Sequence, residues 1–204
     1  MKYVGNKVFK EELNTDLLQM NGILTFEKET TIKNLKVNGN AKFVKRSNID
    51  NFKITGNLNS LDYLICSNYN GFGKLTGKKI DCIKFNHQGN LEIEEINSDD
   101  FNFIISSNSN IEKIKSKNIT ISLKDRRENL NLVAKKVDKT DLMKLDLMKD
   151  ASKLLNCYNS RKQKLVVDVI EGENIYLENT VARLVRGKNI TLAKNCEIGN
   201  IEYI

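Results

Sequence analysis

The stretch Asn34-Leu-Lys-Val-Asn-Gly-Asn-Ala41 decides the fold, because it returns seventeen residues later as Asn51-Phe-Lys-Ile-Thr-Gly-Asn-Leu58. Near the C-terminus, Gly172-Glu-Asn-Ile-Tyr-Leu177 is followed fifteen residues later by Gly187-Lys-Asn-Ile-Thr-Leu192. In each unit alternate residues are apolar, and Gly and Asn punctuate the pattern. Short strands that recur in this way are typical of a solenoid of coiled β-strands. The sequence therefore predicts an all-β protein, a parallel β-helix of about 15–20 residues per coil.

The repeat pattern divides the chain into four segments. Residues 1–22 carry no repeat, so we expect an N-terminal cap or a loose arm there. Apolar triplets of strand type run through residues 23–123 and resume over residues 165–204 as the C-terminal coils. Without residues 124–164 about 160 residues remain, which at about seventeen residues per coil predict nine or ten coils. The triplets are short, so we expect each to form one short side of a coil.

Residues 124–164 interrupt the repeats and hold most of the positive charge. They contain twelve Lys and Arg against six Asp and Glu, a surplus of six in a chain whose net charge is +7. Residues 138–156 are rich in helix formers, which predicts an inserted or flanking helix. The segment could bind an anionic membrane surface or a protein partner, although a solvated helix face explains it more simply. Tyr158 is the only aromatic residue in it, so we expect no specific nucleic-acid binding.

The composition agrees with a solenoid. The chain contains no Pro, as interior strands require because each must donate its N–H groups to the next coil. An AT-rich genome explains the abundance of Asn, Lys and Ile equally well. We expect Asn mainly at tight corners, with hydrogen-bonded stacks of Asn as the alternative. The first residues lack a signal-peptide core, so we expect a cytoplasmic protein with four reduced cysteines, and membrane association only through charge.

The repeats also nominate core and edge residues. We expect stacked aliphatic layers in which eight residues point inward: Leu35, Val37, Phe52, Ile54, Ile175, Leu177, Ile190 and Leu192. A terminal coil leaves unpaired backbone groups and an open apolar layer, and the sequence places no polar cap after its last strand. We therefore expect a self-assembly interface made of Cys196, Ile198, Ile201, Tyr203 and Ile204.

Three groups of residues invite a chemical interpretation, and each has a simpler one. Gly71–Lys79 fails the phosphate-loop pattern at Phe72 and Lys79, so we expect a β-helix corner. Cys82 and His87 lack the further ligands of a zinc site, so we expect a core thiol and a surface imidazole. The paired carboxylates Glu94-Glu95 and Asp99-Asp100 are expected in solvated loops. We expect no catalytic, cofactor or metal site.

The C-terminal run from Val169 to Tyr203 resembles the bactofilin-like, polymer-forming cytosolic proteins of bacteria. The resemblance rests on Ile170-Glu-Gly172, Leu177-Glu178, Val185-Arg-Gly187, Cys196-Glu-Ile-Gly199 and Glu202-Tyr203, with Thr180 and Ala182. Upstream, Leu35–Ala41 and Lys117–Leu123 resemble the repeated strand units of that family. The resemblance implies a β-helix that assembles end to end into filaments without nucleotide. This chain departs from the family in having no Pro-rich tail and less regular N-terminal repeats.

The sequence leaves three classes of function in order of preference. The first is a structural, self-assembling cytoskeletal scaffold whose partner is the protein itself. The second is a non-polymerising β-helix that binds a protein, a glycan or a membrane surface. A carbohydrate-active β-helix enzyme is a distant third.

Overall fold

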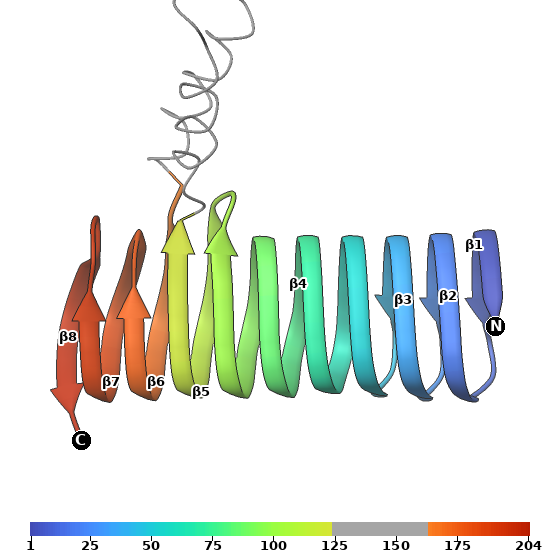
Figure 1. Cartoon of the computed structure of the whole chain (residues 1–204), viewed down its shortest axis with the longest axis horizontal. Coiled ribbons are helices and arrows are strands. Elements are labelled where there is room, and N and C mark those ends of the chain that lie inside the picture. Colours follow the sequence, from blue (N-terminus) through green and yellow to red (C-terminus); the bar gives the residue numbers. More distant parts are fainter. Residues whose placement is uncertain (124–162) are drawn as a thin grey trace, which may run out of the picture.

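The chain winds into a rod of parallel β-coils, with its termini at opposite ends (Figure 1). The computed structural model describes residues 1–123 and 163–204. Every element in these two ranges is a strand, and the order in the sheet follows the chain. The strands are β1 (Lys2–Phe9), β2 (Leu13–Phe26), β3 (Thr30–Phe43), β4 (Ser47–Ile105), β5 (Ser109–Leu123), β6 (Leu165–Leu177), β7 (Thr180–Leu192) and β8 (Glu197–Tyr203). The predicted parallel β-helix and its number of coils are confirmed, since the solenoid has about 10 turns.

The register of the coils is the register of the sequence repeats. Asn34 is aligned with Asn51, so the repeated units Asn34–Ala41 and Asn51–Leu58 lie directly side by side in β3 and β4. In the same way Gly172 of β6 is aligned with Gly187 of β7. A coil takes seventeen residues in the first part of the rod and fifteen near its C-terminal end, as the repeats predict.

The strands are longer than the triplets suggested, because pairing continues around many corners. β4 alone spans 59 residues and winds through successive coils. One corner is built on a column of glycines with positive φ, which includes Gly22 (135°) and Gly39 (132°). A Cβ atom on Gly39 would overlap the carbonyl oxygen of Gly22 in the neighbouring coil. Glycine therefore allows the coils to stack at this corner without a break in the ladder.

The solenoid begins at Lys2, so the expected boundary at residue 23 is wrong. β1 pairs in parallel with β2, and β2 with β3, in the same seventeen-residue register as the later coils. Residues 1–22 therefore form the first coil and the beginning of the second, and not a loose arm. Their repeat is weak in the sequence because two inward positions of the first coil carry polar residues, Lys7 and Thr15, which are aligned with Leu24 and Ile32.

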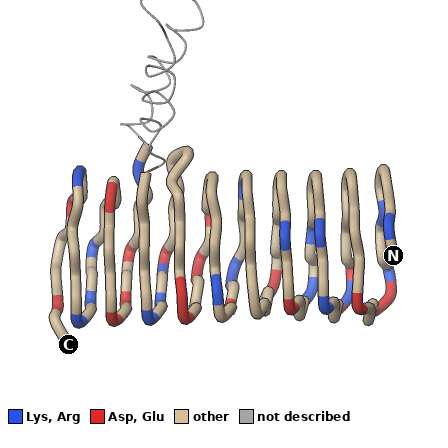
Figure 2. The backbone as a smooth tube through the Cα atoms, in the orientation of Figure 1, with Lys and Arg blue, Asp and Glu red and all other residues tan. Residues whose placement is uncertain are grey.

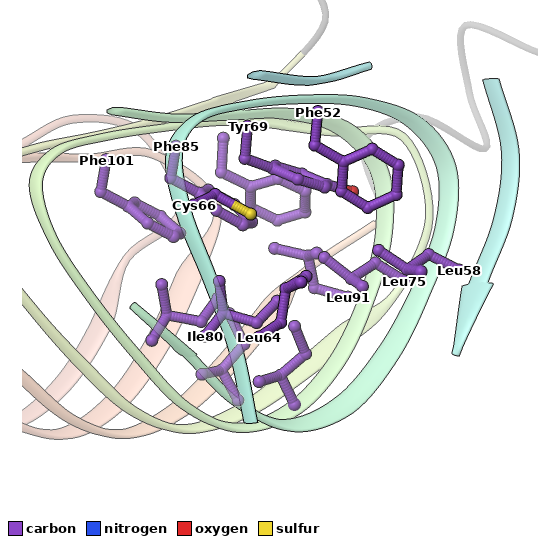
Figure 3. Close-up of a cluster of buried hydrophobic side chains, with 14 of the residues drawn as sticks. Phe52, Leu58, Leu64, Cys66, Tyr69, Leu75, Ile80, Phe85, Leu91 and Phe101 are labelled. Carbon is purple, nitrogen blue, oxygen red and sulfur yellow. The ribbon is translucent and has the colours of Figure 1, made fainter. Parts of the chain in front are cut away.

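The core consists of stacked rows of like side chains. Figure 3 shows Phe52, Tyr69, Phe85 and Phe101 in one row and Leu58, Leu75 and Leu91 in another. Successive rings in the aromatic row have centroids 4.9–5.7 Å apart. Six of the eight predicted core residues are at most 3% exposed: Leu35, Val37, Phe52, Ile54, Ile175 and Leu177. The other two, Ile190 and Leu192, lie in β7, which the last strand covers only in part, and they are more exposed.

Many Asn side chains form hydrogen-bonded ladders along the rod, the alternative that the sequence had left open beside their use at corners. The amide of Asn51 donates to Asn34 (3.1 Å) and accepts a bond from Asn68 (3.0 Å). A second ladder joins Asn118, Asn174 and Asn189 through bonds of 2.9 and 2.8 Å. A carboxamide carries both donor and acceptor, so identical residues one coil apart satisfy each other. Among the described non-glycine residues, only Asn179 and Asn195 have positive φ.

The basic segment leaves the rod at one corner and returns to it at the same place. β5 pairs directly with β6, Ser109 being aligned with Leu165 although 56 residues separate them. The predicted helix at 138–156 lies outside the described residues. So does nearly all of the segment 124–164, including the surface expected to bind a membrane or a protein.

Candidate assembly surfaces at the ends of the solenoid

The last strand covers only half of the coil before it. β8 pairs with Val181–Gly187, the first part of β7. No described strand pairs with the outer side of the second part of β7, which ends at Leu192. The C-terminal end of the rod is therefore a step with two free strand edges. Such edges offer unpaired N–H and C=O groups that a further strand can use.

The residues predicted for self-assembly lie on this step. Ile198 is aligned with Ala182 and Ile201 with Val185, so both continue buried columns and are themselves half-buried. Tyr203 and Ile204 are 70% and 67% exposed. The structure thus brings the nominated apolar residues to one end of the rod, while their role in assembly stays a prediction.

Cys196 belongs to the same layer and is partly covered. Its thiol donates to the carbonyl oxygen of Leu177 at 3.2 Å. Burial raises the pKa of this thiol, and nearby backbone hydrogen bonds oppose the rise. Cys196 is therefore held as a neutral thiol that acts as a small apolar side chain.

Leu192 was expected in the core and is 40% exposed, so that prediction is wrong. It is aligned with Leu177, which is buried, and continues the same inward column. Its exposure follows from the step, because β8 stops short of it. Ile190 is half-buried for the same reason. Both residues belong to the open apolar layer, and their local sequence does not distinguish them from Ile175 and Leu177, the buried residues with which they are aligned.

Ion pairs hold the terminal coils to one another. Arg186 lies between Glu171 (3.2 Å) and Glu202 (2.6 Å), one coil away on each side. Arg183 binds Asp168 through two hydrogen bonds of 2.5 and 3.1 Å. Figure 2 shows acidic and basic residues alternating from coil to coil along one edge near the C-terminal end. Exposed pairs of this kind contribute little each, about 0–1 kcal/mol, but they fix the register of the last coil.

The N-terminal end presents a layer of different composition. Tyr3, Phe9 and Leu13 are half-buried and pack against the core. Lys7 is also half-buried and is aligned with the buried Leu24. The two ends of the rod are therefore both incomplete layers, but only the N-terminal one carries a cation at a core position.

His87 is buried, which corrects the expectation of a surface imidazole. It is 4% exposed and lies between two aromatic residues, Tyr69 and Phe103. A Cβ atom on Gly71 would overlap both the Tyr69 hydroxyl and the His87 ring, so this glycine makes room for them. Cys82 is partly buried and packs against the core, and burial raises its pKa to about 12. Within residues 1–123 and 163–204, no cluster of three or more His, Cys, Asp or Glu residues could hold a metal ion.

The remaining candidates lie in strand β4 and take part in contacts between coils. Gly71–Lys79 is a paired strand segment and not only a corner. The acidic pairs were expected in loops, but they too are in β4. Asp99 binds Lys117 at 2.9 Å in the next coil. The pKa of Glu95 is lowered, mainly by a hydrogen bond from Asn97.

Comparison with known proteins places no family name on the chain. No family model matches it, and no solved structure does. A protein of Bacillus subtilis (strain 168), the uncharacterized protein YhbF, is 52% identical over 46 residues. The match covers 22% of this chain and 20% of that protein. No helix in the described ranges has the length and hydropathy needed to cross a membrane.

Proposed function

We propose that this protein is a structural scaffold subunit that assembles with copies of itself, end to end and without nucleotide. The observation that carries the proposal is the apolar step at the C-terminal end of the rod. Ile190, Leu192, Ile198 and Ile201 continue the columns of the core there, and Tyr203 stands exposed beside them. A second copy placed against this step extends the core of both molecules. The resemblance to bactofilin-like proteins supports the same function.

The energetics predict an assembly that depends on concentration. If a junction buries about 400 Å² of apolar surface, it gains on the order of 10 kcal/mol. Association costs about 4–15 kcal/mol, so the net gain is small unless the free strand edges also pair across the junction. Two identical ends form a symmetric, closed contact, which the exposed backbone of β8 permits.

The test compares two lysine substitutions of similar exposure. Leu192→Lys puts a charge into the open layer, whereas Ile104→Lys puts one on the flank, where Ile104 is 37% exposed. We expect the wild-type protein and Ile104→Lys to self-associate in sedimentation velocity as concentration rises, and Leu192→Lys to do so at least about tenfold more weakly. Circular dichroism should show the same β-fold in all three.

A wild-type protein that stays monomeric at several hundred micromolar would contradict the proposal. Equal self-association of Leu192→Lys and the wild type would do so as well. Either result favours the second class of function, a monomeric β-helix that binds a protein, a glycan or a membrane surface along its flank.

A further inference from the structure

The first coil carries a lysine where every following coil carries an aliphatic or small residue. Lys7 of β1 is aligned with Leu24 of β2. The column then continues through residues that are all buried: Leu24, Ala41, Leu58, Leu75 and Leu91. Lys7 therefore occupies an inward position at the N-terminal end of an apolar column. The alternation of β1 points it inward, as it does Tyr3 and Phe9.

The ammonium group of Lys7 lies over the aromatic rings of its own coil. It is 5.3 Å from the ring centroid of Tyr3 and 5.3 Å from that of Phe9. Phe9 begins a stack with Phe26 and Phe43, whose successive centroids are 5.2 and 5.1 Å apart. A cation over ring faces is attracted by their negative charge density, and the long side chain keeps its end in water. Lys7 thus covers the end of the aromatic stack with a solvated charge.

This arrangement makes the two ends of the rod unequal as contact surfaces. A copy docked on the N-terminal layer would take water away from the Lys7 ammonium. No described inward position of either end layer carries a carboxylate to pair with it, and Glu197 and Glu202 of β8 already pair with Lys164 and Arg186. Burying an unpaired cation in this way opposes association. In a symmetric contact of two N-terminal ends, two such cations would also face each other. At the C-terminal end Ile190, Leu192, Ile198 and Ile201 impose no such cost.

We propose that Lys7 closes the N-terminal end of the solenoid to self-association, so that the assembly is a pair of rods joined at their C-terminal coils. The partner is a second copy of this chain. The inference rests on the proposed function for the C-terminal junction, but the closing role of Lys7 has a test of its own. The paired unit carries two identical N-terminal ends that face outward.

The decisive experiment opens one end while the other is blocked. Leu192→Lys blocks the C-terminal step, and Lys7→Leu restores at residue 7 the side chain that Leu24 carries. We expect the untagged double variant to form dimers through its N-terminal ends, with self-association at least about tenfold stronger than that of Leu192→Lys alone. Lys7→Leu by itself should form species larger than dimers, whereas the wild type should stop at dimers. Sedimentation velocity over a range of concentrations measures all of these.

Two controls separate charge from shape and from folding. Lys2→Leu removes the same charge from the same coil at an exposed position, and should behave like the wild type. Lys7→Met keeps an unbranched side chain without the charge and should behave like Lys7→Leu. Circular dichroism and thermal unfolding establish that each variant is folded.

The outcomes distinguish the inference from the proposed function. A folded double variant that remains monomeric overturns the role of Lys7, and so does a wild type that forms species beyond dimers. A monomeric wild type overturns the C-terminal junction, and the paired assembly with it. If the wild type is monomeric but the double variant forms dimers, the closing role of Lys7 is still supported.

Discussion

His87 shows how a single polar residue is accommodated in a stacked apolar core. Its Nε2 lies 3.1 Å from the carbonyl oxygen of Gly73, and its Nδ1 lies 3.3 Å from the hydroxyl oxygen of Tyr69. A carbonyl can only accept, so Nε2 carries the proton and Nδ1 accepts a bond from Tyr69. The neutral imidazole thus satisfies both nitrogens inside the rod. Burial lowers the pKa of His87 from its ordinary value of 6.5 to about 4, although hydrogen bonds to backbone oxygens of Gly73 and Asn90 oppose this.

This pKa predicts a loss of stability in mild acid. Between pH 6.5 and 4 the unfolded chain binds a proton at His87 and the folded protein does not, so the free energy of unfolding falls as the pH falls. This lowering of the pKa corresponds to a loss on the order of 3 kcal/mol in the free energy of unfolding. The ordinary pKa of a tyrosine is 10 and burial raises that of Tyr69 further, so Tyr69 does not titrate in this range. Urea unfolding at several pH values should show this fall in the wild type and a smaller one in His87→Gln. Parallel curves for the two proteins would exclude His87 as the cause.

At the scale of the element, the corner glycines set how closely the coils approach. Gly5 and Gly39 belong to the same column and both have positive φ, 92° and 132°. A Cβ atom on Gly39 would overlap the Gly22 carbonyl oxygen, whereas a Cβ atom on Gly5 would meet nothing within 4 Å. Both positions therefore require a positive φ, and they differ in the contact with the neighbouring coil.

The pair gives a prediction with an internal control. Gly5→Ala should cost only the strain of a positive φ, roughly 1–3 kcal/mol. Gly39→Ala should cost clearly more, because the two coils must also move apart or the ladder must break at that corner. Urea unfolding followed by circular dichroism measures both costs. Equal destabilisation by the two substitutions would show that backbone strain, and not the contact between coils, maintains the glycine column.

At the scale of the whole molecule, the rod is continuous across the point where the basic segment is inserted. The Ser109 N–H donates to the Lys164 carbonyl oxygen, and in the next coil the Leu165 N–H donates to Asn179, each at 3.0 Å. Lys164 and Asn179 thus occupy equivalent corner positions. Ser122 and Leu123 still belong to β5 and pair with Ile104 and Ile105, so the insertion lies between Leu123 and Gln163.

Deleting residues 124–162, so that Leu123 is joined to Gln163, should leave a folded solenoid with a seventeen-residue coil, the length found in the first part of the rod. Because each coil contacts only its neighbours, the change should not spread along the rod. Circular dichroism should show mainly β-structure in both proteins, and the difference between the spectra should contain the helical signal predicted for residues 138–156. A deletion variant that unfolds would mean that the segment stabilises the rod. A difference spectrum without a helical signal would contradict the predicted helix.

The sequence by itself determined the coil repeat and most of the core, and the physical reason lies in the solenoid. Its contacts join neighbouring coils, so the alternation around Leu35 and Ile54 is enough to show which side chains point inward. Only the tertiary structure decided which side chain each residue contacts in the next coil, because that depends on residues in another part of the chain. The polar neighbours of His87, Asn86 and Gln88, predict a surface residue. It is buried because Gly71, which has no side chain, leaves space for its ring. Leu192 and Lys7 both continue buried columns, and their exposure depends on whether another coil covers them.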